Sequence, residues 1–256
     1  MSADVLNDLL RMTNRLGEPE RDYVILGEGN TSARAERGEM YVTASGTELR
    51  SARPESFVRV SLDRALGLLD LHAPTDEQIR DALIATKTDG QREPRPSVET
   101  PVHAVFLSQP GVSFVGHTHP AAINMLTCSK QFEEWATRRL FPDEVVMCGT
   151  APMLVPYEDP GIPLARVIKG CLAEYHAERG RPPKVVLMQN HGMTALGASA
   201  RDVENITQMA VKAARILAGT FAFGGPRFLP KKHVARIDQR LDEHYRQRII
   251  MERERT

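Results

Sequence analysis

The run Val185-Val186-Leu187-Met188 constrains the fold of this 256-residue chain more than any other segment. A short, continuous apolar run fits a strand that is buried on both faces, as in sheets covered by helices. Further along, residues 202–221 place Val203, Ile206 and Leu217 on one stripe at helical spacing, which predicts an amphipathic helix. Shorter strand-like and helical patterns interleave through the rest of the chain. The sequence therefore predicts an α/β domain.

Local patterns predict the remaining elements. Predicted strands cover residues 23–26, 31–35, 40–43, 57–60, 113–117, 145–148, 153–155 and 184–189. Predicted helices cover residues 2–16, a segment capped by Thr75 and Gln78 that runs through Leu83, and residues 97–107, 119–126, 164–177 and 234–255. No repeat or evident linker divides the chain. We expect one domain over residues 1–222 and a C-terminal extension, 223–256, whose charged helix packs on the domain or on a neighbouring subunit.

Composition argues against several classes of function. Lys and Arg together number 33, as do Asp and Glu, and this balance argues against a nucleic-acid or membrane-surface binder. No apolar run approaches the roughly 20 residues that span a bilayer, and the amino terminus, with Asp4 and Asp8, does not resemble a signal peptide. Cys128, Cys148 and Cys171 are few, odd in number and widely spaced, which favours reduced thiols and a cytoplasmic location.

Three histidines form the most informative candidate site. His117 and His119 stand one residue apart, and on an extended segment both imidazoles point to the same side because side chains alternate faces. His191 follows the predicted buried strand, so its imidazole is expected at the strand end, where catalytic groups commonly sit. Three imidazoles can hold a metal and leave a position open for substrate. For the His-x-His pair alone, two unrelated histidines are the alternative.

Two glycine-containing segments are candidate anion sites. In residues 27–34, the glycines let backbone amides approach an anion closely, and Asn30 adds an amide donor. The segment is neither a Walker loop nor a dinucleotide fingerprint. In residues 43–47, the hydroxyl of Ser45 lies beside Gly46 at a predicted strand end, where it can contact a phosphate. A plain turn is the alternative for each segment taken alone.

The segment 96–103 carries a candidate acid or base. Ser97 is predicted to cap a helix, with Pro101 tolerated in the first turn. Glu99 then falls in the first turn, where the helix dipole favours negative charge. It is a candidate general base beside a metal, and an ordinary first-turn glutamate is the alternative. His103 lies one turn further on and is expected to support the site rather than to bind metal.

Taken in this order, the segments resemble the class II aldolase/adducin family. The resemblance covers roughly residues 5–220, and the stretches 96–103 and 117–123 are most similar to rhamnulose-1-phosphate aldolase-type members. The matching motifs are Gly-Asn-Thr-Ser-x-Arg at 29–34, Ser-Gly at 45–46, Ser-x-Glu at 97–99, His-Thr-His-Pro at 117–120 and Asn-His-Gly at 190–192.

The resemblance implies a single-domain, three-layer α/β/α sandwich with a largely antiparallel central sheet. It also implies a homotetramer with active sites between subunits. In that family's terms, His117, His119 and His191 would hold a divalent metal, usually Zn²⁺ and alternatively Mn²⁺. Glu99 would be the acid/base. The residues expected to bind the substrate phosphate are Asn30, Ser45, Gly46 and Ser97.

The implied activity is that of a metal-dependent aldolase. A sugar or deoxysugar ketose 1-phosphate would be cleaved to dihydroxyacetone phosphate and an aldehyde, through an enediolate stabilised by the metal as a Lewis acid. Decarboxylation of a 3-keto acid and 4-epimerisation of a sugar phosphate are alternatives on the same scaffold. A non-catalytic interaction module, as in the adducin head, is a further alternative, but such a module has no need for the three histidines and Glu99 together.

Two departures from the family pattern bear on the reaction. Fuculose-phosphate-type members have paired serines before the catalytic glutamate, and here the second is Val98, which fits a different anion or a decarboxylase. Those members also supply a tyrosine downstream of the histidine pair as a proton donor across the subunit interface. The corresponding stretch has no tyrosine, so Glu144 is expected to take that role, with Tyr157 and Tyr245 as alternatives from a neighbouring subunit.

Overall fold

A seven-stranded sheet forms the centre of the computed structural model, which describes residues 2–240 and 242. The strand order is β3-β2-β1-β4-β7-β6-β5, and all neighbouring strands are antiparallel except β5 and β6. The sheet is thus largely antiparallel, as predicted. The strands are β1 (Asn30–Arg34), β2 (Glu39–Thr43), β3 (Phe57–Ser61), β4 (Phe114–Thr118), β5 (Met153–Val155), β6 (Val185–Met188) and β7 (Gly192–Gly197).

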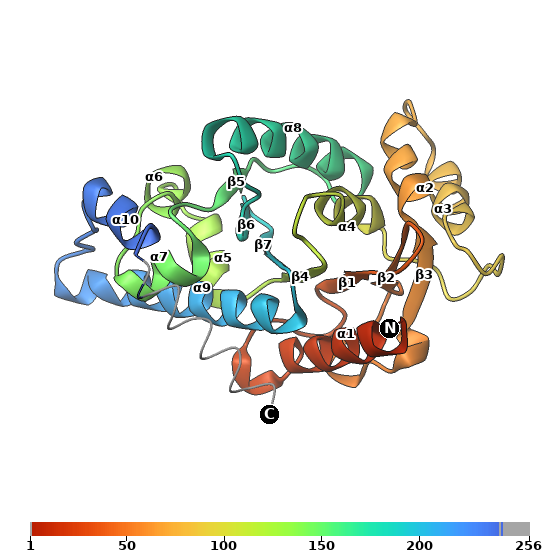
Figure 1. Ribbon diagram of the computed structural model, residues 1–256, viewed down its shortest axis with the longest axis horizontal. Helices are drawn as coiled ribbons and strands as arrows, with labels where there is room; N and C mark the ends of the chain where they lie inside the picture. Colours follow the sequence, from red (N-terminus) through yellow and green to blue (C-terminus); the bar gives the residue numbers. More distant parts are fainter. Residues whose placement is uncertain (1, 241, 243–256) are drawn as a thin grey trace.

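Helices cover both faces of this sheet, and the predicted three-layer α/β/α sandwich is confirmed. Figure 1 shows α4 and α8 on one side and α1 and α9 on the other. Within the described part of the chain, no helix combines the length and apolarity needed to cross a membrane. The α-helices are α1 (Ser2–Leu16), α2 (Leu62–Gly67), α3 (Asp76–Ala85), α4 (Thr100–Leu107), α5 (Ala121–Thr127), α6 (Phe132–Ala136), α7 (Pro142–Cys148), α8 (Ile162–Arg179), α9 (Ala200–Thr220) and α10 (Lys231–Asp238). Short 3₁₀ turns are η1 (Pro19–Arg21), η2 (Leu49–Ser51), η3 (Pro54–Ser56), η4 (Leu68–Asp70) and η5 (Phe221–Phe223).

The apolar run of β6 explains why helices are needed on both sides. Val186 and Met188 belong to the core that packs against α4 and α8, whereas Val185 and Leu187 belong to the core beneath α1, α5 and α9. Side chains alternate between the faces of a strand, so a strand that is apolar at every position can only be stable between two apolar layers.

Two predicted strands are wrong. Residues 145–148 belong to helix α7, because Pro142 at its start and Asp143 and Glu144 in its first turn are helix-initiating signals that outweigh the short apolar run. Residues 23–26 form an irregular loop, in which Leu26 has a φ of 52° and cannot continue a strand. The backbone carbonyl of Tyr23 instead accepts a hydrogen bond from His119 N at 2.9 Å.

The C-terminal extension begins after α9 and packs on the domain. Gly224 and Gly225 have positive φ values and end the α9–η5 segment. Helix α10 then places Val234 and Ile237 against Val145 of α7. It starts earlier than predicted and ends at Asp238, while residues 241 and 243–255 of the predicted helix lie outside the described residues. The boundary at residue 222 remains a prediction.

Sheet topology gathers the predicted site residues at one edge. Strands β2, β4 and β6 all run in the same direction, so their carboxyl ends share an edge, and antiparallel β1 begins there. Asn30 pairs directly with His117 across β1 and β4. The segments that follow β2, β4 and β6 carry Ser45, His119 and His191.

We expect Gly116→Ala to destabilise the protein by about 1–3 kcal/mol, because a side chain there overpacks the core. A Cβ at Gly116 would lie 2.6 Å from Cγ1 of Val203 in α9 and 3.0 Å from Cδ1 of Leu16 in α1. The measurement is the urea concentration at which half of the protein is unfolded. It should fall while the slope of the unfolding free energy against urea concentration stays unchanged. Gly170→Ala is the control, because Gly170 is an exposed helical position with open space around its Cβ direction. That variant should gain about 0.5–1 kcal/mol.

Candidate metal centre

The three predicted histidines converge. Nε2 of His117 lies 2.9 Å from Nε2 of His119. The ring centroids of His117, His119 and His191 are separated by 4.7, 4.9 and 5.0 Å. One nitrogen from each ring can be chosen so that all lie within 4.8 Å of one another. His117 is buried, and the other two are partly exposed, so the cluster has one open side.

Backbone geometry explains why these positions converge. His117 is the penultimate residue of β4, and His119 follows directly where the strand ends. His191 lies in the short connection between β6 and β7, which turns at Asn190 with a φ of 54°. Gly192 is required after it, since a Cβ there would lie 2.6 Å from the Thr118 carbonyl oxygen and 2.7 Å from Cδ2 of His119.

The donor set fits a divalent cation. Nδ1 of His117 donates to the Met193 carbonyl at 2.9 Å, which leaves Nε2 with a free lone pair facing His119. Burial lowers the pKa of His117 and of His191, and burial together with the neighbouring His117 lowers the pKa of His119 to about 4. Neutral imidazoles are the form that binds metal. In a tetrahedral zinc site, nitrogens at about 2.0–2.1 Å from the ion lie roughly 3.3 Å apart, close to the spacing of the first pair.

Glu99 lies against this cluster. Its two carboxylate oxygens are 3.4 Å from Nε2 of His117 and 3.6 Å from Nε2 of His191. Burial alone would raise the pKa of Glu99. When His117 and His191 carry a proton, their positive charge and a 2.6 Å hydrogen bond from the Asn30 amide outweigh burial and lower the pKa of this carboxyl. The Glu99 carboxyl group thus stands beside three candidate metal-binding nitrogens, which is the arrangement that metal-assisted proton transfer requires.

The local structure around Glu99 differs from the prediction. Helix α4 begins at Thr100, so Glu99 is the residue that precedes it and Ser97 is not its N-cap. The Ser97 hydroxyl accepts a hydrogen bond from Glu99 N at 3.2 Å, and its carbonyl accepts from Thr100 N at 3.0 Å. Ser97 therefore forms a tight turn ahead of the helix, and this turn aims Glu99 at the histidines.

The residues predicted to bind phosphate lie next to one another. Ser97 N donates to the Thr43 carbonyl at 3.2 Å, and Ser45 N donates to the Arg95 carbonyl at 2.9 Å, so the end of β2 runs beside the turn before Glu99. The Asn30 amide nitrogen is 3.4 Å from the Ser97 hydroxyl. Gly46 has a φ of 79° and is exposed with Ser45. The structure thus groups these residues around the turn that precedes Glu99; their binding of phosphate remains a prediction.

Glu28 is a site residue that sequence reasoning did not single out. One of its carboxylate oxygens is 3.8 Å from Nδ1 of His119, and the other accepts a hydrogen bond from Ile25 N at 3.0 Å. A carboxylate near the second nitrogen of a metal-binding histidine orients the ring. In the sequence, the flanking glycines Gly27 and Gly29 were the pattern that could have pointed to Glu28. A Cβ at Gly29 would lie 2.6 Å from the His117 carbonyl oxygen, so this loop passes close to the end of β4.

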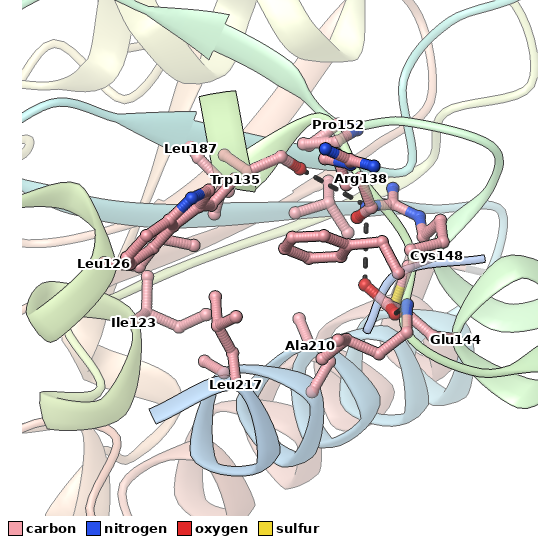
Figure 2. A pocket seen from close by; sticks show the side chains of 17 residues that line it. Ile123, Leu126, Trp135, Arg138, Glu144, Cys148, Pro152, Leu187, Ala210 and Leu217 are labelled. Atoms are coloured by element: carbon pink, nitrogen blue, oxygen red, sulfur yellow. Dashed lines mark hydrogen bonds and ion pairs between the residues drawn. The ribbon is translucent and has the colours of Figure 1, made fainter. Parts of the chain in front are cut away.

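Within one subunit, Glu144 lies away from the histidines, and its role as a proton donor across a subunit interface remains a prediction. Its carboxylate is buried, lies 3.4 Å from the Arg139 guanidinium and accepts a hydrogen bond from Leu140 N at 2.7 Å. Burial raises its pKa. Figure 2 shows Glu144 beside Cys148 and Ala210, in a pocket between α7 and α9 that is lined mainly by apolar side chains. None of its contacts among the described residues reaches Glu99 or the metal cluster.

Val98 and Tyr157 are exposed side chains in segments that adjoin the candidate site in the sequence or in the sheet. Val98 is 46% exposed, and its Cγ2 lies 3.2 Å from the point where a Cβ on Gly161 would be. Tyr157 follows β5 at the same edge of the sheet, and its backbone N donates to Gln189 Oε1 at 3.3 Å, next to Asn190. The Tyr157 hydroxyl donates to Asp159 at 3.1 Å. Tyr245 lies outside the described residues.

Buried histidine predicts a pH dependence of stability. Burial lowers the pKa of His103 from 6.5 to about 3, so the unfolded chain takes up this proton at a higher pH than the folded chain does. Stability that is present above pH 6.5 is therefore lost as pH falls towards 3. In the metal-free protein, His103→Gln should reduce the slope of the unfolding free energy against pH in this range by up to about 1.4 kcal/mol per pH unit. Urea unfolding over the part of this range where the protein stays folded measures both slopes; equal slopes would contradict the expectation.

A family model described as "Class II Aldolase and Adducin N-terminal domain" matches residues 7–218. The chain belongs to this family. Class II aldolases depend on a divalent metal, and among the residues that the structure describes the three histidines form a group that could hold one. The family motifs and the convergent geometry identify the same edge of the sheet.

Two individual relatives that match most of this chain carry different descriptions. The "Uncharacterized oxidoreductase YuxG" of Bacillus subtilis is 29% identical over 239 residues, which cover 88% of this chain and 32% of that protein. The chain thus spans about a third of the length of this relative. The "3-oxo-tetronate 4-phosphate decarboxylase" of Haemophilus influenzae is 25% identical over 198 residues, covering 77% of this chain and 80% of that protein.

Solved structures share the fold. YgbL of Klebsiella pneumoniae, provisionally described as an aldolase/epimerase/decarboxylase, has a TM-score of 0.71 at 21% identity and covers 93% of this chain and 99% of its own. The L-fuculose-1-phosphate aldolase of Thermus thermophilus has a TM-score of 0.61 at 18% identity and covers 88% of this chain and 99% of its own. At such identities the likeness supports the fold alone.

Proposed function

We propose that this chain is a divalent-metal-dependent aldolase that cleaves a sugar or deoxysugar ketose 1-phosphate to dihydroxyacetone phosphate and an aldehyde. The observation that carries the proposal is the position of the Glu99 carboxylate within 3.4–3.6 Å of two nitrogens of a three-histidine cluster. Zn²⁺ is the proposed ion and Mn²⁺ the alternative, since three imidazoles suit several first-row metals. Family membership supports the lyase class.

In this proposal the residues divide the chemistry as follows. His117, His119 and His191 would hold the ion, which when bound supplies Lewis-acid stabilisation of negative charge on substrate oxygens. Glu99 carries the proton that the carbon takes up once the carbon–carbon bond has broken. Ser45, Gly46, Ser97 and the Asn30 amide bind the phosphate and hold the substrate in register with Glu99.

Glu144 has no part in this proposal. Its carboxylate is enclosed beside Arg139, so it is assigned to the interior of the domain rather than to proton transfer. The second proton donor is proposed to be Tyr157, because it follows β5 at the edge of the sheet that carries the histidines and its side chain is exposed there.

Incubation with defined substrates tests the reaction. The zinc- or manganese-loaded protein is given a panel of ketose 1-phosphates and, separately, 3-keto acids and their phosphates. Release of triose phosphate from a ketose 1-phosphate is expected. Release of carbon dioxide without triose phosphate would overturn the aldolase proposal, and epimerisation at carbon 4 would be seen as a new sugar phosphate of unchanged mass.

Decarboxylation of a 3-keto acid phosphate is the second candidate. Two observations favour it: Val98 stands where fuculose-phosphate-type aldolases have a serine, and the Haemophilus relative that covers most of this chain is a 3-oxo-tetronate 4-phosphate decarboxylase. Loss of carbon dioxide also leaves negative charge on the carbonyl oxygen, so the same histidines and Glu99 would serve.

We also propose that the chain works in the cytoplasm as a homotetramer with sites at subunit interfaces. Its three cysteines are unpaired, in keeping with a reducing compartment. Ile25 and Leu26 are 62% and 81% exposed in the loop that contacts His119, and exposed apolar side chains beside a site are typical of a partner surface.

Leu26→Asp is expected to shift the protein to smaller species and to lower turnover. The substitution buries a charge if Leu26 lies in an interface, and the φ of 52° suits aspartate in the free subunit. Sedimentation velocity measures the assembly. Arg37→Asp is the matched control, being exposed at a φ of 57° in the β1–β2 turn at the opposite edge. Identical sedimentation of both variants would count against this interface.

A further inference from the structure

His103 is a fully buried, ionisable side chain to which the proposed reaction gives no task. It lies on α4 one turn after Glu99, and it is not one of the three clustered histidines. Its Nδ1 is 2.6 Å from the Ser32 hydroxyl, and its Nε2 is hydrogen bonded to Oδ1 of Asn30. Asn30 in turn donates to Glu99 at 2.6 Å. Four side chains from β1 and from the start of α4 therefore form one continuous chain of hydrogen bonds.

The donor and acceptor in each of these hydrogen bonds can be assigned by starting from Glu99. The Glu99 carboxylate can only accept hydrogen bonds, so the group of Asn30 that faces it must be the NH₂. Oδ1 of Asn30 then faces His103 and needs a donor, which requires the proton on Nε2 of the imidazole. Nδ1 is left as an acceptor and takes the hydroxyl proton of Ser32. For a neutral imidazole, no other assignment satisfies all three contacts.

We infer that His103 and Ser32 are positioning residues that lock the Asn30 amide in the one orientation that presents its NH₂ to both Glu99 and the candidate phosphate pocket. The Asn30 nitrogen is 2.6 Å from Glu99 and 3.4 Å from the Ser97 hydroxyl, so it joins the two halves of the site. Turned by half a rotation, the amide would present an oxygen to the carboxylate and repel it.

Burial of the hydrogen-bonded side chains explains why the Asn30 amide keeps this orientation. His103, Ser32 and Asn30 are all buried, so water does not compete for these hydrogen bonds. Burial also lowers the pKa of His103 to about 3, which keeps the ring neutral and able to accept from Ser32. The register of β1 with β4 places Asn30 opposite His117, so a shift of the amide is felt directly beside the metal cluster.

This inference deepens the proposed function, because the oriented amide serves the proton-transfer and phosphate groups of that site. A misplacement of about 1 Å at a reacting group can lower turnover by about 100-fold. Loss of the lock is therefore expected to lower kcat by about 10- to 100-fold while zinc stays bound, since none of the clustered histidine nitrogens is touched.

Two amide substitutions separate orientation from packing. In His103→Gln the side-chain nitrogen reaches the place of Nε2 and can still donate to Asn30. In His103→Asn the amide reaches only the place of Nδ1, so the donor to Asn30 is lost although the residue is equally polar. We expect His103→Gln to keep kcat within about threefold of the parent and His103→Asn to lose it, with equal zinc content by elemental analysis. Equal kcat for the two variants would overturn the inference.

Nuclear magnetic resonance tests the lock without any substrate. In the ¹⁵N-labelled parent protein, measured with zinc and metal-free, His103 should be the Nε2–H tautomer, and the Asn30 side-chain NH₂ should exchange slowly with solvent. Ser32→Ala should weaken that protection, and adding Ser32→Ala to His103→Asn should have no further effect. The Nδ1–H tautomer, or a rapidly exchanging amide, would overturn the inference even if every variant failed to fold. A protein that shows the lock but no lyase activity would instead overturn the proposed function.

Discussion

Replacement of His119 by alanine is expected to remove bound metal and turnover together. His119 supplies the nitrogen that lies 2.9 Å from Nε2 of His117, and two remaining imidazoles are too few for a tightly held catalytic ion. Activity should fall by about a thousandfold or more, to the level of the chelator-treated parent protein. Elemental analysis of the purified variant and a cleavage assay measure the two losses.

His176→Ala is the control for this experiment, because His176 is an exposed histidine on α8. It should retain both metal and activity. The chelator-treated parent should regain activity when zinc is added, whereas His119→Ala should not. A His119→Ala protein that kept one equivalent of metal and full turnover would show that the three-histidine cluster is not the catalytic centre.

Glu99→Gln is expected to keep the metal and to lose turnover by about 10²- to 10⁴-fold, the range typical of a lost general acid or base. The substitution preserves size, and the glutamine oxygen can still accept the hydrogen bond that Asn30 donates. What it removes is the group that can exchange a proton beside His117 and His191. Steady-state kinetics and zinc content are measured on the same preparation. Full turnover with full metal content would rule out Glu99 as the proton carrier.

Glu144→Gln provides a matched control, since it alters another buried carboxylate of the same chain. Glu144 pairs with Arg139 away from the histidines, so its loss should lower stability and leave the turnover of folded molecules within about twofold. If Glu144→Gln instead abolished turnover in a stable protein, the catalytic role first predicted for it from the sequence would stand, and its assignment to the interior would be wrong.

The sequence was most reliable where local pattern and function coincide. The apolar run of β6, the stripe of α9 and the Thr75–Gln78 capping box of α3 all depend on neighbouring residues, and the structure confirms each of them. The His-x-His pair was also readable, because its geometry depends only on the alternation of a strand end. Residues 145–148 were misassigned because a run of four apolar residues fits a strand or a helix equally well.

By itself, the amino-acid sequence determined the α/β class, the family motifs and the residue types capable of metal and proton chemistry. Only the tertiary structure decided which of these residues meet. The register that sets Asn30 opposite His117, the orientation of its amide by His103, the approach of Glu28 to His119 and the separation of Glu144 from the cluster all arise between segments distant in sequence. The physical reason is that hydrogen-bond direction and charge proximity act over a few ångströms in space, whatever the distance along the chain.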